Sequence, residues 1–165
     1  MSILVDIGAA YRSPRREMDH QLSIMTEPRI MMLGLTYCAL SFLAELPGLS
    51  AEVALAGESN DVLYGKVGSL FIWRVFFALL MFYAIAALSR LILKLFQGQG
   101  TWIEARLALM WALMVSTPLV LISGMCKVFA PPPVFLVASL LTTVVFFWQW
   151  VTCLAVTEFP RSAKA

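Results

Sequence analysis

Four long apolar stretches divide the chain, and polar or helix-breaking residues separate them. The stretches cover residues 30–46, 67–96, 106–126 and 134–156. A helix needs about 20 apolar residues to cross a hydrocarbon core of about 30 Å, and about 17 is the lower limit. The pattern therefore predicts an all-α fold, a polytopic membrane helix bundle with four transmembrane helices.

Prolines and glycines mark the predicted ends of these helices. Pro28 precedes the first span, where proline suits the first helical turn, and Pro47 with Gly48 is expected to end it. Three successive prolines at 131–133 separate the third span from the fourth, because they cannot continue a helix. The second stretch is the longest, so its helix is expected to tilt or to project beyond the bilayer.

The first 29 residues follow a different pattern. Ser13 and Pro14 predict a helix start, with serine as the cap and proline in the first turn. Met18, Leu22 and Met25 then share one helical face. This predicts an amphipathic helix on the cytoplasmic surface of the bilayer, or equally one packed on the protein's own cytoplasmic loops. The opening MSILVDIGAA lacks the long apolar middle of a cleavable signal and is expected to be retained.

The overall composition indicates that lipid is the solvent for much of the chain. Hydrophobic residues make up 61% of the 165 residues and charged residues 13%, whereas soluble domains average about 45–50% and about 25%. The length fits one domain. We therefore expect a transmembrane domain over 30–157, between an N-terminal interfacial region over 1–29 and a cytoplasmic tail over 158–165.

Basic residues concentrate at one end of the predicted bundle. The opposite end has only Lys66 and Lys127, and its predicted loop over 47–66 is acidic. Cytoplasmic loops are enriched in Lys and Arg, so both termini are expected in the cytoplasm. The residues at the basic end are Arg12, Arg15, Arg16, Arg29, Arg90, Lys94, Arg106, Arg161 and Lys164.

Two charged residues fall inside the spans. Arg74 lies about 10 Å into the second helix at 1.5 Å per residue, and Glu45 lies at the end of the first span. Charged side chains inside a membrane are costly and usually face protein or water. Both lie toward the same side of the bilayer and could pair, either as a structural ion pair or as a gate or proton site.

Small and polar residues form a stripe along each of two spans. Such stripes let transmembrane helices approach closely, and a polar path through the bundle is the alternative use. The stripe of the first span is Gly34, Cys38, Ser41 and Glu45, and that of the fourth is Ser139, Thr142, Phe146, Gln149 and Cys153.

Signatures of enzymes are absent from the sequence. His20 is the only histidine, which excludes His-based triads and multi-histidine metal sites. The three cysteines have no regular spacing and are expected to be free thiols. An intramembrane enzyme would rest on Glu45 and Gln149 alone. We therefore expect a non-enzymatic protein without metal or cofactor, and the scattered basic residues do not fit nucleic-acid binding.

The most distinctive segment is the predicted hairpin GQGTWIEAR, which covers residues 98–106 and joins the second and third spans. Its two glycines allow a sharp reversal of the chain. Thr101 and Glu104 have the spacing of a capping box for the third span. Trp102 would then lie at the membrane interface.

This hairpin and the helix after it, GQGTWIEARLALMWALMVSTPLVL, resemble the Ypt-interacting protein (Yip) family, particularly its short bacterial members. The resemblance implies a transmembrane helix bundle with a cytoplasmic N-terminal region, located in a bacterial inner membrane. Eukaryotic members are associated with small GTPases and vesicle traffic, and many have five spans. The residues that carry the match are Gly98, Gly100, Trp102, Arg106, Trp111 and Pro118.

These observations favour a protein that acts through helix–helix contacts, as an accessory or assembly subunit of a membrane complex or as a membrane-organising factor. Its expected partners are the lipid bilayer and other membrane protein subunits or further copies of itself. The alternative is a subunit of a small oligomeric transporter or channel. The residues expected to serve structure or interaction are Glu45, Arg74, Gly98, Gly100, Trp102, Arg106, Pro118 and Gln149.

Overall fold

The computed structural model describes residues 3–158, and every regular element in that range is a helix. The predicted all-α fold is confirmed. The predicted tail lies outside the described residues except for Glu158. The elements are α1 (Ile3–Arg12), α2 (Pro14–Ser23), α3 (Glu27–Leu55), α4 (Asn60–Ile72), the π-helix η1 (Trp73–Phe77), α5 (Ala78–Leu95), α6 (Trp102–Phe129) and α7 (Pro132–Glu158).

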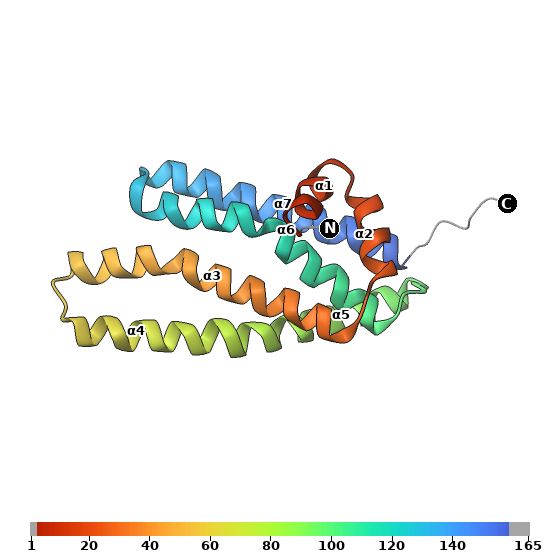
Figure 1. The fold of residues 1–165 in the computed structure, drawn as a ribbon, viewed down its shortest axis with the longest axis horizontal. Coiled ribbons are helices and arrows are strands. Elements are labelled where there is room, and N and C mark those ends of the chain that lie inside the picture. Colours follow the sequence, from red (N-terminus) through yellow and green to blue (C-terminus); the bar gives the residue numbers. More distant parts are fainter. Residues whose placement is uncertain (1–2, 159–165) are drawn as a thin grey trace.

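Four helical segments are long and apolar enough to cross a membrane, and the protein is therefore a multi-pass membrane protein. They run alternately in opposite directions. The α3–α4 and α6–α7 turns lie at one end of the molecule, and the α5–α6 loop lies with α2 at the other (Figure 1). The four segments are Glu27–Leu55, Asn60–Leu95, Trp102–Phe129 and Pro132–Glu158.

Helix α6 forms the centre of the bundle. Every residue from Leu107 to Thr117 is buried, because α3, α5 and α7 pack around this half of the helix. Helix α6 changes direction part-way along (Figure 1), and Pro118 inside it accounts for a bend of this kind. Many large apolar side chains of α4, α5 and α7 stay exposed, as expected for surfaces in contact with lipid tails.

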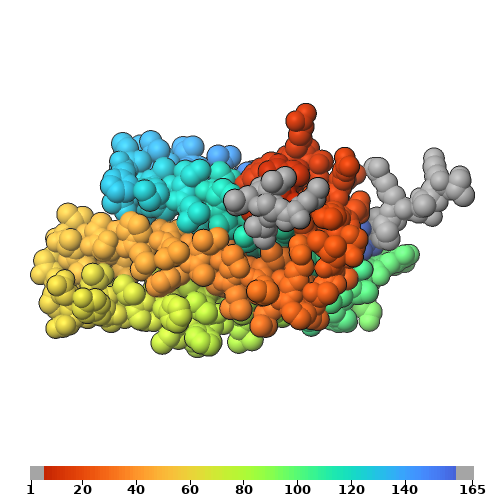
Figure 2. Space-filling view, viewed as in Figure 1, coloured from red at the N-terminus to blue at the C-terminus, as the bar shows by residue number. Residues whose placement is uncertain are grey.

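Helices α3 and α6 run parallel and approach closely where small residues line their contact. A methyl group added at Gly34 would meet Met110 Sδ at 2.9 Å, and one added at Gly124 would overlap the carbonyl oxygen of Ala44. Small residues allow this approach of backbones in membranes. The first three residues of the first-span stripe are buried and serve this packing. On the other side of α3, helix α4 lies beside it along one face of the molecule (Figure 2).

The prediction that Pro47 and Gly48 end the first span is wrong. Helix α3 has 29 residues and continues through Pro47 to Leu55. An internal proline removes one N–H donor, which leaves the carbonyl group four residues earlier, that of Leu43, without its usual bond. One lost bond does not stop the helix when helix-forming residues follow. The predicted loop over 47–66 shrinks to a turn at 56–59, where Gly57 has a φ of 64°.

The predicted proline hairpin is present, but its prolines enter a helix. Helix α7 begins at Pro132, so only Ala130 and Pro131 separate it from α6. The first N–H groups of a helix have no partner within it, so proline loses no bond there. The second span is longer than predicted, because the apolar segment runs from Asn60 to Leu95 and contains η1.

Helix α2 begins at Pro14 as predicted, but Ser13 does not cap it. The Ser13 hydroxyl donates a hydrogen bond to the carbonyl oxygen of Ala9 instead, because α1 precedes it. The predicted apolar face is confirmed: Met18 is fully buried, and Leu22 and Met25 pack against the core. This face covers α6 and α7 rather than loops.

Helix α1 docks on the transmembrane helices through two hydrogen bonds. The Tyr11 hydroxyl donates to the carbonyl oxygen of Val115 in α6 at 2.8 Å. The Gln149 side chain of α7 donates to the carbonyl oxygen of Ala10 at 3.0 Å. Burial raises the pKa of Tyr11 above its ordinary value of 10.0. The N-terminal helices therefore close the bundle over the buried half of α6.

Candidate functional site

Glu45 of α3 and Arg74 of η1 form an ion pair across the contact between the first two spans. The pairing that the sequence suggested is therefore present. It is incompletely covered, since 36% of the Glu45 side chain and 29% of the Arg74 side chain remain exposed.

The depth of this pair follows from the helical rise. Glu45 follows Arg29 by 16 residues along α3, and Arg74 precedes Arg90 by 16 residues along the second span. At 1.5 Å per residue, both lie about 24 Å from the end of the bundle that carries Arg29 and Arg90. A hydrocarbon core of about 30 Å therefore contains the pair, toward the side of the α3–α4 turn.

The π-helix η1 sets the direction of Arg74. The amide of Ala78 donates to the carbonyl oxygen of Trp73, five residues earlier, which is the bond that defines a π-turn. The rings of Trp73 and Phe77 stack within η1, with centroids 5.2 Å apart. Single π-turns inside α-helices are rare and are frequent at functional sites. No sequence pattern predicted this one.

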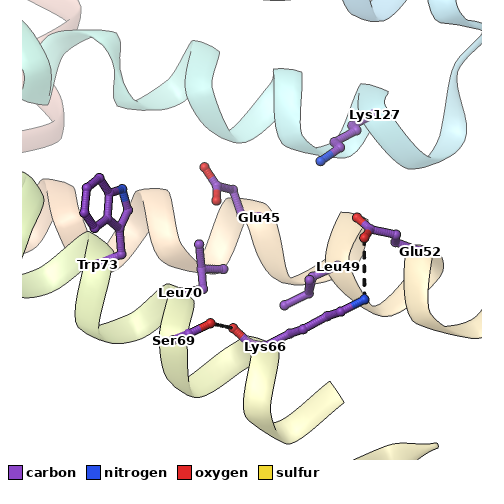
Figure 3. A pocket seen from close by; sticks show the side chains of 8 residues that line it. All are labelled: Glu45, Leu49, Glu52, Lys66, Ser69, Leu70, Trp73 and Lys127. Atoms are coloured by element: carbon purple, nitrogen blue, oxygen red, sulfur yellow. Dashed lines mark hydrogen bonds and ion pairs between the residues drawn. The ribbon is translucent and has the colours of Figure 1, made fainter. Parts of the chain in front are cut away.

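A groove of about 470 Å³ opens beside Glu45, the acidic partner of this pair (Figure 3). Helix α3 forms its floor, the second span forms one wall, and α6 contributes a lysine from the other side (Figure 3). Apolar side chains separate the charged groups. The lining residues are Glu45, Leu49, Glu52, Lys66, Ser69, Leu70, Trp73 and Lys127.

Opposite charges meet at the mouth of this groove. Lys66 Nζ lies 2.7 Å from Glu58 Oε2 and 3.7 Å from Glu52 Oε1. The side chain of Lys127 passes over Gly48, where a methyl group would meet its Cδ at 3.1 Å. Gly48 therefore makes room for a lysine that reaches from α6 toward α3. The groove thus holds ion pairs next to apolar walls.

A second polar centre lies at the opposite end of the bundle, around Glu158 of α7. This side chain is fully buried, and its Oε2 accepts a hydrogen bond from Arg90 at 2.9 Å and from the amide of Gly100 at 3.0 Å. Arg90 also donates to the carbonyl oxygen of Gly98. The amide of Gln99 donates to the backbone oxygen of Glu158 at 3.0 Å. The side chain and backbone of Glu158, together with Arg90, thus hold residues 98–100 of the α5–α6 loop.

The other predicted residues are spread over the molecule. Arg106 pairs with Glu27 at 3.0 Å. Trp102 and Pro118 are exposed, and Gln149 binds α1. The predicted capping box at Thr101 and Glu104 is present. The structure therefore brings together Glu45 with Arg74 and Gly98 with Gly100, but it does not bring the two pairs together.

Sequence reasoning missed Glu158 and Lys127 as parts of these centres. The sequence predicts that Glu158 begins the cytoplasmic tail, whereas in the structure it is the last residue of α7. A single acid at the end of the last span, on the side where Arg90 and Lys94 gather, was the available signal. No sequence signal pointed to Lys127. Its place over Gly48 depends on how α3 and α6 are aligned along their contact, which the sequence alone does not give.

Comparisons with known protein families, with curated proteins and with solved structures find no match to this chain. What the groove and the loop do must therefore follow from their own geometry. The groove places the Glu45–Arg74 ion pair beside apolar side chains. The loop places the Arg90–Glu158 ion pair beside backbone groups of the α5–α6 loop.

Proposed function

We propose that this protein is a non-enzymatic accessory or assembly subunit, and that it binds another membrane protein through the face around Glu45 and Arg74. One observation carries the proposal: this ion pair lies within the hydrocarbon depth, yet about a third of each side chain is left uncovered. Charged groups inside membranes face protein or water. A partner helix would supply the missing cover.

The energetics favour a protein over lipid as the cover. A charged side chain at the centre of a membrane helix costs about 2.5–3.5 kcal/mol on insertion scales. Pairing offsets part of this, but exposed ions still lose their hydration when lipid covers them. A transmembrane helix lying in the groove would present polar groups to Glu45 and Arg74, and apolar groups to Leu49 and Trp73.

The proposal includes the cellular location and the family. The basic residues lie at the end of the bundle that carries α2 and the α5–α6 loop, which supports a cytoplasmic location for both termini, in a bacterial inner membrane. The hairpin over 98–106 supports membership of the Yip family. Its two glycines have a physical reason here, since both leave space for the carboxylate of Glu158.

A subunit of an oligomeric transporter or channel is the alternative proposal. The buried half of α6 occupies the centre of the described chain, so a path would have to form between copies. Liposome flux measurements separate the two functions. Flux that depends on Glu45 and Arg74 would favour transport, and its absence together with a captured partner would favour assembly.

The decisive experiment places a photo-crosslinking residue at Trp73, which lines the groove beside the ion pair, in living cells. Val144 on α7 is the matched control, because both residues are 56% exposed. We expect a discrete protein adduct at position 73 and only lipid adducts at position 144. Arg74→Leu should abolish the adduct at 73. Equal adduct patterns at both positions would overturn the proposal.

A further inference from the structure

A separate hollow of about 440 Å³ lies between the start of α2 and the outer surface of α7. Its basic wall comes from the first turn of α2. Ser13 precedes this turn, and its side chain does not cap the helix. The other wall of the hollow comes from the C-terminal half of α7. The lining residues are Ser13, Pro14, Arg15, Arg16, Trp148 and Thr152.

The two arginines give this hollow an uncompensated positive charge. Arg15 and Arg16 are exposed, and none of the described residues that line the hollow is acidic. Among the described residues, neither arginine forms an ion pair. The nearest acid along the helix, Glu17, is buried and accepts a hydrogen bond from Gln21 on another face. The hollow is therefore complementary to an anion.

The position of the hollow relative to the bilayer limits what this anion can be. Trp148 and Thr152 precede Glu158 by ten and six residues, which corresponds to depths of about 15 and 9 Å along α7. Trp148 is half exposed, and Val151 beside it faces outward. Because Glu158 binds Arg90 at the edge of the hydrocarbon core, this wall of the hollow lies beside acyl chains. Exposed arginine side chains at such a depth extend toward the headgroup layer and pair with anions there. In a bilayer, the anion within their reach is a lipid phosphate.

We propose that this hollow binds the headgroup of an anionic glycerophospholipid from the leaflet on the side of α2. The guanidinium groups of Arg15 and Arg16 can each hold phosphate oxygens with two parallel hydrogen bonds. The indole of Trp148 provides an amphipathic wall for the glycerol and the upper acyl chains. The site is independent of the partner-binding face, which lies at the other end of the bundle.

The test measures lipid binding to the purified full chain by native mass spectrometry. Short-chain phosphatidylglycerol is titrated into the detergent-solubilised protein, with short-chain phosphatidylcholine and inorganic phosphate in parallel titrations. We expect one tight phosphatidylglycerol site and much weaker binding of the other two. Phosphate binding as tight as phosphatidylglycerol binding would show that no lipid is required and would overturn the proposal.

Substitutions then locate the site. A basic residue near an anionic lipid contributes about 1 kcal/mol, so Arg15→Gln and Arg16→Gln should each raise the Kd about fivefold and together about thirtyfold. Arg12→Gln is the matched control, because Arg12 is exposed but lies outside the hollow. Circular dichroism checks that the variants keep their helices. Unchanged binding by the double variant, or equal weakening by Arg12→Gln, would refute the assignment.

Discussion

Glu158 occupies the space that Gly98 and Gly100 leave open. A methyl group on Gly98 would overlap its Oε2, and one on Gly100 would lie 2.8 Å from its Cδ. Glycine is required at these positions by the close approach of a side chain, since neither residue has a positive φ. The second carboxylate oxygen, Oε1, is buried and has no hydrogen-bond partner among residues 3–158.

Gly100→Ala should therefore destabilise the protein. Forcing an extra methyl group into a filled site costs about 1–3 kcal/mol. Gly65→Ala is the matched control, because nothing lies within 4 Å of a methyl group there, and alanine in a helix is favoured by about 0.5–1 kcal/mol. Thermal unfolding in detergent should show the first change lowering the Tm and the second raising or preserving it. A similar response of both variants would contradict this account of the loop.

The Glu45–Arg74 pair makes a prediction about coupling. Glu45→Gln and Arg74→Gln should each destabilise the protein, because each leaves one charge unpaired at hydrocarbon depth. The double variant should lose less free energy of unfolding than the two single variants lose together, with a coupling energy of about 0.5–3 kcal/mol. Unfolding measured in lipid nanodiscs tests this. Strict additivity would mean that the two side chains do not interact in the membrane.

At the scale of elements, the π-helix η1 absorbs one extra residue in the second span. Deleting Phe76 should convert η1 to regular α-helix, because a π-turn holds about one residue more than the α-helical turn that replaces it. The helices before and after η1 then keep about their present relative rotation. Deleting Leu88, in the regular part of α5, should instead turn the segment before it by about 100°, so that Arg74 would leave Glu45. We expect similar helix content for both variants by circular dichroism, and a lower Tm for the Leu88 deletion. Equal Tm values for the two variants would show that η1 does not absorb the extra residue.

The docking of α1 should depend on alkaline pH through Tyr11. Because burial raises the pKa of Tyr11 above 10.0, its contribution to stability is fully present below about pH 10. That contribution is lost as the pH rises through the folded-state pKa, since the phenolate cannot donate to Val115. Limited proteolysis should release α1 at high pH in the wild-type protein. Tyr11→Phe should lose about 1 kcal/mol at neutral pH and show no such alkaline step.

The whole molecule makes a prediction about topology. In a background with the native cysteines replaced, Ser59→Cys in the α3–α4 turn should react with an impermeant thiol reagent added outside the cell. Gln99→Cys in the α5–α6 loop should react only after permeabilisation. This outcome follows from the concentration of basic residues at the α5–α6 end. The reverse pattern of labelling would place both termini outside.

The sequence predicted the architecture well because long apolar runs determine membrane spans. It also placed Glu45 and Arg74 near one another, since two charges at equal depth in adjacent spans have few other partners. It failed where the outcome depended on neighbouring elements. Pro47 looked like a stop but costs only one hydrogen bond, η1 has no residue signature, and the burial of Glu158 depends on a loop that precedes it by 58 residues.

The contacts of Glu158 with Arg90 and Gly100 also set an order of events during biosynthesis. The 58 residues between Gly100 and Glu158 take about 3–12 s to synthesise at about 5–20 residues per second. During this interval the first two spans are complete and α6 and α7 are still being made, so Arg90 lacks its carboxylate and the α5–α6 loop is open. Completion of α7 is therefore the step that closes the molecule. Until then, the nascent chain presents an unsecured loop to the proteases and insertion factors that inspect newly made membrane proteins.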